Sequence, residues 1–393
     1  MIYFDNAATT EMDDRVLDVM VPYLKGQYGN PGTLYKLGRD AKLAINKARE
    51  QVAELINCSP DQVVFTSGGS EANNFAFNNR LKWSRPVITT KMEHDSVREG
   101  IYGLDWMAND KLPVNRKGVV LPEVFSSYVN GFACYSGGHH IRTAAIMYVN
   151  NEVGSVNPVS EIARICDEAG IALHVDCVQA LGSIPVDVRD IGCASASFSS
   201  HKIHGPKGVG ALYIENSEYY EPLIFGGDDQ EFGLRGGTEN VAGIVGFGEA
   251  CRIVKEGIND SMRHTKALKN VFLDTIRSEL NNHNELEIMH INGDLDNCVS
   301  KILSLRFDGV DAQTLVLMAD TRGVCISAGS ACRSHDNEPS PALLAMGLTD
   351  EQARSTVRIS FSIYNTLDEA REGARIIARC ALSLKNSGGG QNG

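Results

Sequence analysis

The sequence predicts an α/β protein in which a mostly parallel central sheet carries helices on both faces. Two observations support this prediction. Short apolar segments alternate with amphipathic segments over the first 250 residues, as expected for repeated β-α units. The polar residues that follow the apolar segments would meet at the carboxyl edge of such a sheet, where α/β proteins bind their ligands.

The length of 393 residues exceeds what one compact core usually holds, so two domains are expected. We predict a large domain over residues 14–255. A smaller α+β domain is predicted from residues 1–13 together with 256–386. The Gly-rich end, residues 387–393, is expected to be a disordered tail.

Charge and cysteine content narrow the function classes. The chain has 37 Lys and Arg against 49 Asp and Glu, and this net charge of −12 disfavours direct binding to nucleic acid or to an anionic membrane. No signal peptide and no membrane-spanning apolar run is evident. Ten cysteines without a C-x-x-C pair argue against a zinc ribbon or a disulfide framework, so we expect no metal site and a cytoplasmic location.

The first elements end in a possible anion cradle. Helices are expected over residues 14–25 and 38–56, followed by a strand over 62–66. The Gly-rich turn after this strand contains Gly69 and Ser70 and leads into a helix, an arrangement whose backbone N–H groups can hold a phosphate. A capped helix without a ligand is an equally good interpretation.

Further strands are expected over residues 87–90, 144–149, 171–176, 194–198 and 208–213. The polar residues at or just beyond the strand ends are predicted to converge on one rim; they are Ser70, His94, Asn151, Asp176, Gln179 and Lys202.

The second half of the chain is expected to form the smaller domain. A boundary is predicted near residues 250–260, after a Gly-rich stretch over 225–248. Beyond it we expect helices over 268–280, 311–319 and 367–382 and strands over 302–307, 323–327 and 357–361.

Two rim residues suggest the chemistry. Lys202 follows a buried strand, and poor solvation there would lower its pKa and make it a candidate amine for a Schiff base; a surface lysine is the alternative. Asp176 ends an apolar strand and needs a cationic partner, for which a pyridinium nitrogen is one candidate and backbone capping the alternative. Gln179 could contact the same ring or be a solvated helix residue. His94 could also contact the ring or be a helix N-cap.

Two residues of the second half are also candidates. Arg358 lies on the opposite strand face from its apolar neighbours and could bind a carboxylate, or lie on the surface. Cys332 follows small residues in a long polar segment, where Arg333 and His335 would favour its thiolate; the other cysteines fit core positions better.

Taken together, these residues make the chain resemble the cysteine desulfurases, in the class V aminotransferase group of the fold-type I pyridoxal-phosphate enzymes. The resemblance covers nearly the whole chain. It rests on five motifs in family order: Thr66-Ser67-Gly68-Gly69-Ser70-Glu71-Ala72-Asn73-Asn74, Asn150-Asn151-Glu152-Val153-Gly154, His174-Val175-Asp176, Ser199-Ser200-His201-Lys202 and Gly329-Ser330-Ala331-Cys332. The stretch after Cys332 is similar to the long-loop group.

The resemblance implies a role for each matching residue. Lys202 would carry pyridoxal 5'-phosphate, and His94 would stack on its ring. Arg358 would bind the carboxylate of L-cysteine, and Cys332 would take the sulfur as a persulfide. The other cofactor contacts implied are Gly69, Ser70, Asn151, Asp176, Gln179, Ser199, His201 and, from the second subunit of a homodimer, Thr238.

The sulfur acceptor is left open by the sequence. The family feeds iron–sulfur cluster assembly, tRNA thiolation and DNA phosphorothioation, and the acidic composition favours a protein as first acceptor. A selenocysteine lyase or another pyridoxal-phosphate lyase is the alternative enzyme. A cofactor-free paralogue that acts as a scaffold is disfavoured by intact Lys202, Asp176, Cys332 and Arg358.

Overall fold

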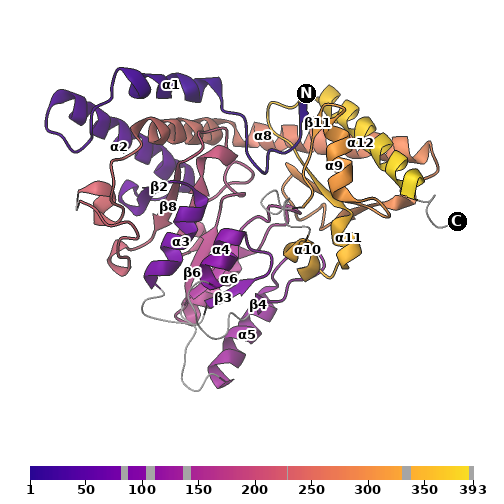
Figure 1. Cartoon of the computed structure of the whole chain (residues 1–393). Coiled ribbons are helices and arrows are strands. Elements are labelled where there is room, and N and C mark those ends of the chain that lie inside the picture. Colours follow the sequence, from indigo (N-terminus) through magenta and orange to yellow (C-terminus); the bar gives the residue numbers. More distant parts are fainter. Residues whose placement is uncertain (81–86, 103–110, 136–142, 228, 330–337, 389–393) are drawn as a thin grey trace.

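A seven-stranded sheet forms the centre of the computed structural model, which describes residues 1–80, 87–102, 111–135, 143–227, 229–329 and 338–388 (Figure 1). Its order is β2-β8-β7-β6-β5-β3-β4, and only β8 runs antiparallel to its neighbours. The bounds are β2 Val63–Thr66, β3 Val87–Thr90, β4 Lys111–Leu112, β5 Thr143–Met147, β6 Ala172–Asp176, β7 Ser195–Ser199 and β8 Gly210–Ile214.

Helices cover both faces of this sheet, which confirms the predicted fold class. Along β2, Val63 and Phe65 enter one hydrophobic core while Val64 between them enters another, as the two-residue period of a strand requires. Helices α3 and α4 pack on the Val64 side, and most others pack on the opposite side. The bounds are α1 Asp14–Lys25, α2 Lys36–Ile56, α3 Gly69–Arg80, α4 Asp95–Tyr102, α5 Pro122–Tyr135, α6 Val159–Glu168 and α7 Val188–Ile191.

The C-terminal part builds a separate core around a three-stranded antiparallel sheet of order β12-β10-β9. A parallel pair, β1 with β11, brings the N-terminal residues to the same core. The predicted domain limits stay a prediction, and these two cores are consistent with them. The bounds are β1 Ile2–Tyr3, β9 Met289–Asn292, β10 Ile302–Phe307, α9 Ala312–Asp320, β11 Val324–Cys325, α10 Pro341–Ala345, α11 Asp350–Arg354, β12 Thr356–Ser360 and α12 Leu367–Gly388.

One long helix, α8 (Val241–Asn281), joins the two cores. The sequence predicted a helix only over 268–280, because the Gly-rich stretch before it resembled a loop. The structure corrects this start by 27 residues. A Cβ on Gly246 would lie 2.5 Å from Sδ of Met20, and one on Gly248 would lie 2.6 Å from Cα of Ala48. These glycines let α8 approach α1 and α2 closely.

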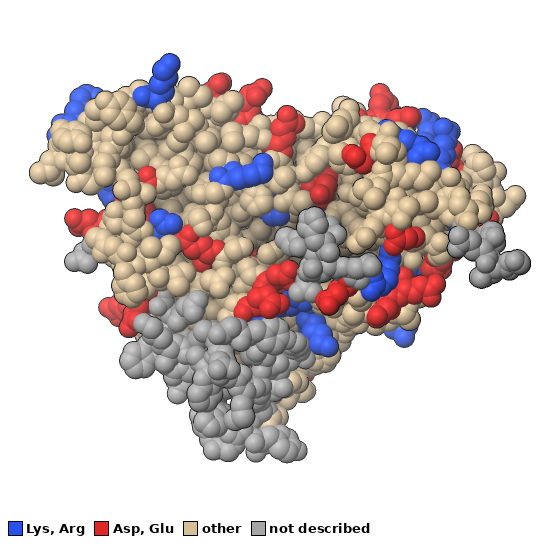
Figure 2. Space-filling model, viewed as in Figure 1, with Lys and Arg blue, Asp and Glu red and all other residues tan. Residues whose placement is uncertain are grey.

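The surface carries mixed charge. On the face shown in Figure 2, acidic and basic side chains of the described residues are interspersed, and no broad basic area forms. Within the described part of the chain, no helix is both long and apolar enough to cross a membrane.

Candidate active site

A cavity of about 270 Å³ lies where the carboxyl ends of the central strands face the C-terminal core. All six rim residues predicted from the strand ends line it, together with Arg358 from β12. Gly69, Ser199 and His201 line it as well. Right-handed β-α-β connections place the ends of β3, β5, β6 and β7 on one edge of the sheet, which explains the convergence.

Asp176 is the buried anion of this cavity. Its carboxylate accepts hydrogen bonds from Nδ2 of Asn73 and from the backbone N–H of Val178, both at 2.9 Å. Among the residues described, no lysine or arginine forms an ion pair with it. Because a buried carboxylate without a cation is costly, the site is suited to a ligand that presents a positive charge here.

A hydrogen-bond chain holds this carboxylate in place. A carboxylate can only accept, so the amide nitrogen of Asn73 faces Asp176 and its oxygen faces Nε2 of His174, 2.9 Å away. Burial lowers the pKa of His174 to about 3, so the ring is neutral and carries its proton on Nε2. Its Nδ1 then accepts from the Ser195 hydroxyl at 2.9 Å.

The same amide extends the chain to His94. Nδ2 of Asn73 also donates to Oγ of Ser96 at 2.9 Å, and this hydroxyl lies 2.8 Å from Nδ1 of His94. The backbone N–H of Ser96 donates to the same Nδ1 at 3.1 Å. In the neutral ring Nδ1 therefore accepts, and Nε2 carries the proton. Asn73 and Ser96 orient His94 and Asp176 together.

The Gly-rich turn between β2 and α3 forms a close backbone approach. A Cβ on Gly69 would lie 2.6 Å from Cγ2 of Val178, and Gly68 has φ +153°, which favours glycine. Ser70 follows in the first turn of α3, whose N-terminus favours an anion. Nε of Arg235 lies 3.0 Å from Oε1 of Glu71, which neutralises the acid nearest to this cradle.

Lys202 lies in the 3-10 turn that follows β7, and its Nζ donates to the carbonyl oxygens of Ala7 and Ala8 at 2.6 and 2.8 Å. Its surroundings are therefore more polar than the sequence indicated. Beside it, burial and the Lys202 charge lower the pKa of His201 to about 4, so this imidazole is neutral near pH 7. A neutral ring can still donate one N–H to an anion.

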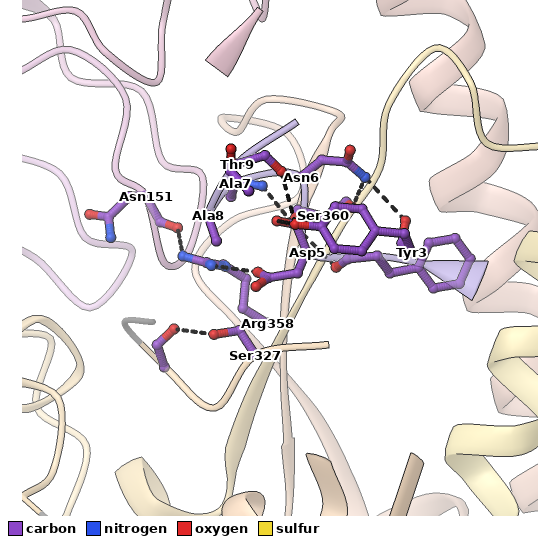
Figure 3. Close-up of polar contacts among 12 residues, drawn as sticks. Tyr3, Asp5, Asn6, Ala7, Ala8, Thr9, Asn151, Ser327, Arg358 and Ser360 are labelled. Carbon is purple, nitrogen blue, oxygen red and sulfur yellow. Dashed lines mark hydrogen bonds and ion pairs between the residues drawn. The ribbon is translucent and has the colours of Figure 1, made fainter. Parts of the chain in front are cut away.

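Arg358 is nearly fully buried and points between Asp5 and Asn151 (Figure 3). Nη2 lies 2.7 Å from Oδ1 of Asp5, and Nη1 donates to the carbonyl of Asn151 at 2.8 Å. The Arg358 guanidinium, predicted to bind a carboxylate, thus already forms two contacts within the protein. A guanidinium has five N–H groups, so three remain for a ligand, including a buried Nε without a partner among the described residues.

Gln179 provides a free acceptor. Its Nε2 donates to the carbonyl of Ala7 at 2.8 Å, whereas its buried Oε1 has no partner in the described part of the chain. A hydroxyl donor in the cavity could satisfy this oxygen, in agreement with the ring-hydroxyl contact inferred from the sequence.

Several residues that line the cavity were not predicted from the sequence. Asn73, Glu93, Arg98 and Glu152 line the cavity without having been assigned a role. Burial raises the pKa of Glu93 to about 8, which keeps it protonated near neutrality. For Asn73 a signal existed: it follows Ser70 by three residues, so it shares a helix face with a predicted contact.

Two predicted residues are not among the described residues that line the cavity. Cys332 lies outside the described residues. Thr238 is exposed and is not among the residues that line this cavity. Its predicted contact is with the cofactor of a second subunit, and it stays a prediction.

Comparisons with known proteins agree on one family. The family model described as Aminotransferase class-V matches residues 2–372. The cysteine desulfurase IscS of Dictyoglomus turgidum is 34% identical over 98% of this chain and 95% of its own length. A solved NifS-like protein superposes with TM-score 0.85 at 34% identity, over 96% of this chain and 98% of that one. A structure of SspA in complex with cysteine has TM-score 0.75 at 29% identity and covers 93% and 100%.

The fold therefore defines a class-V aminotransferase, a class whose members use pyridoxal phosphate. The lysine, the buried aspartate and the anion cradle on the rim of the cavity agree with this class. Identity above 30% over almost the full length narrows this class. The chain belongs to the cysteine desulfurase family.

Proposed function

We propose that this enzyme converts L-cysteine to L-alanine and passes the sulfur to its own Cys332. The observation that carries the proposal is the meeting of Lys202, Asp176 and Arg358 in one cavity of a cysteine desulfurase fold. The structure of SspA with cysteine, a similar protein, also supports cysteine as the substrate.

The cavity fits pyridoxal 5'-phosphate by its chemistry. Asp176 accepts from Asn73 and Val178 but has no cationic partner among the described residues, so it suits the ring nitrogen. The buried Oε1 of Gln179, which has no partner in the described part of the chain, suits the ring hydroxyl. The cradle at Gly69 and Ser70, with Ser199 and His201 beside it, suits the phosphate. Asn151 and His94 would contact the ring. When bound, the cofactor supplies an electron sink for the pair released at the substrate Cα.

The protein's own groups handle the substrate. The remaining N–H groups of Arg358 bind the carboxylate of cysteine and fix its orientation. Lys202 would hold the cofactor, and its free amine would remove the proton from Cα. His94 lines the cavity, and the proton on its Nε2 could be exchanged with the substrate sulfur.

The sulfur leaves in a balanced step. The Cys332 thiolate attacks Sγ of the substrate, an S–S bond forms and the Cβ–Sγ bond breaks. The electron pair of the broken bond stays with Cβ, which takes a proton and yields alanine. Cys332 then holds a persulfide for an acceptor protein or a reducing thiol. We place this chemistry in the cytoplasm.

We further propose a homodimer in which Thr238 contacts the partner's cofactor. Large apolar side chains are exposed on α1, on α2, on the segment between them and on the loop before α8. A monomer rarely exposes so many, so they suit a subunit interface. They are Leu24, Tyr28, Leu34, Tyr35, Leu43 and Phe225.

One assay tests the function. The purified protein is incubated with L-cysteine and dithiothreitol, and alanine and sulfide are measured. Equal amounts of both are expected. Lys202→Ala should abolish both products, and Cys332→Ala should abolish sulfide transfer. Absence of alanine from the wild-type protein would refute the proposal, and selenocysteine consumed in its place would favour the lyase alternative.

A further inference from the structure

A second cavity, of about 410 Å³, lies on the other side of the Lys202 turn and borders the middle of α8. We call it the hinge cavity, because its walls come from α1, from residues 253–265 of α8 and from the C-terminal core at Lys301 and 361–363. In Figure 1, α8 crosses between the two cores in this part of the molecule. None of the roles proposed above uses this cavity.

The unusual feature of the hinge cavity is Lys301. The residue is only 8% exposed, and no hydrogen bond or ion pair of its ammonium involves a described residue. Lys269, another buried lysine, does have partners: its Nζ contacts the Val299 carbonyl at 2.9 Å and Sγ of Cys298 at 3.2 Å. An ammonium on so buried a side chain loses much of its hydration, so an anion in the adjoining cavity would stabilise it.

The acids that line the same cavity are already paired. Asp13 forms an ion pair with Arg15 at 2.6 Å and accepts from the Tyr364 hydroxyl. Two more acids are held by arginines, Asp260 by Arg263 and Glu256 by Arg252. None of the three described carboxylates that line the cavity is therefore left for Lys301.

The remaining groups around Lys301 are positive or neutral. Arg358 adds positive charge near it, and burial lowers the pKa of His204 to about 4, so this ring is neutral near pH 7. His264 donates Nε2–H to the Asn365 carbonyl at 2.8 Å and is not paired with an acid. Burial followed by the Arg358 charge lowers the pKa of Lys301 to about 8, which leaves it mostly protonated at pH 7.

We propose that the hinge cavity binds a small anion, a carboxylate or a tetrahedral oxyanion, with Lys301 as its counter-charge. The hydroxyls of Ser261 and Ser362 line the same cavity and donate to no described acceptor, so they can add hydrogen bonds. The site is distinct from the cradle at Gly69 and does not depend on the proposed reaction. Because Lys202 and His204 also line it, a bound anion would lie directly behind the turn that carries Lys202.

Binding is tested on the protein loaded with pyridoxal phosphate, so that the phosphate cradle is filled. Sulfate and acetate are titrated separately by calorimetry at pH 7, with chloride holding the ionic strength constant. One saturable site per chain is expected for at least one of the two, and the stronger identifies oxyanion or carboxylate as the natural chemistry. No saturable binding of either anion would overturn the proposal.

Variants assign the binding to Lys301. Lys301→Met should weaken it at least tenfold, and Lys301→Arg should keep it within about threefold. Lys269→Met is the matched control, since it removes a buried lysine that has partners, and it should leave the affinity unchanged. If Lys301→Met does not fold, Lys301→Gln takes its place. Unchanged binding in a folded Lys301 variant, or equal losses in the Lys269 control, would refute the assignment.

Discussion

Replacing Asn73 by alanine tests the hydrogen-bond chain beneath the proposed cofactor ring. The substitution removes the amide that donates to Asp176 and accepts from His174, both at 2.9 Å. A hydrogen bond to a charged group contributes about 1.5–3 kcal/mol, and a buried polar group left unpaired costs about 1–3 kcal/mol. The substitution also removes the hydrogen bond to Oγ of Ser96. Since one side chain makes all three contacts and water can enter the gap, we expect a total of about 3 kcal/mol.

Calorimetry of the loaded protein measures this loss. At about 1.2 °C per kcal/mol for a chain of this size, Tm should fall by about 4 °C. The dissociation constant of pyridoxal phosphate should rise about tenfold, equivalent to about 1.4 kcal/mol, because Asp176 is less firmly held.

The neighbouring residue provides the control. Asn74 lies on the same helix, and its Nδ2 donates to the Ser70 carbonyl at 2.8 Å in an exposed position. Asn74→Ala should lower Tm by less than about 1 °C. Equal Tm values for the two variants would refute the reasoning, because they would show that Asp176 and His174 do not depend on Asn73.

Three further predictions concern a pKa, a backbone contact and the substrate carboxylate. Burial raises the pKa of Glu93 from 4.5 to about 8, so its contribution to the free energy of unfolding is full below pH 4.5 and declines toward pH 8. Glu93→Gln should remove up to about 1.4 kcal/mol of that decline per pH unit. Equal slopes of the unfolding free energy against pH for the two proteins, in urea titrations at pH 5–8, would contradict this. A Cβ on Gly210 would lie 2.4 Å from the Phe198 carbonyl oxygen, so Gly210→Ala should cost about 2–3 kcal/mol in thermal unfolding. The control is Gly131→Ala, which should cost nothing because a Cβ there meets no described atom within 4 Å. Arg358→Lys should raise the KM for cysteine about 10-fold to 100-fold with a smaller effect on kcat, since an ammonium cannot bind a carboxylate as a fork; an unchanged KM would exclude the predicted contact.

The rim of the site could be predicted from the sequence because each of its residues lies at or just beyond the end of a strand. Parallel strands bring their carboxyl ends together whatever the details of packing, so Asp176 and Lys202 could be placed on one rim before the fold was known. The side chains that connect these rim residues could not be predicted in this way. Asn73 joins Asp176 to His174 through a helix and a strand that lie 101 residues apart in sequence.

Long-range pairing also explains the other differences. The ion pair between Asp5 and Arg358 joins residues that lie 353 positions apart in the sequence, and no local pattern predicts it. The start of α8 was missed because Gly246 and Gly248 weaken helix propensity, and only their contacts with α1 and α2 show why glycine is required.

The N-terminal residues also determine when the site can form during synthesis. Asn6 and Ala7 bond to Ser360, and the carbonyl of Ala7 holds Lys202. At about 5–20 residues per second, a ribosome needs about 20–70 s between the first of these segments and the last. A nascent chain therefore carries its reactive lysine before the partners of the N-terminal turn exist. The contacts between the N-terminal turn and Ser360 can therefore form only when translation is nearly complete.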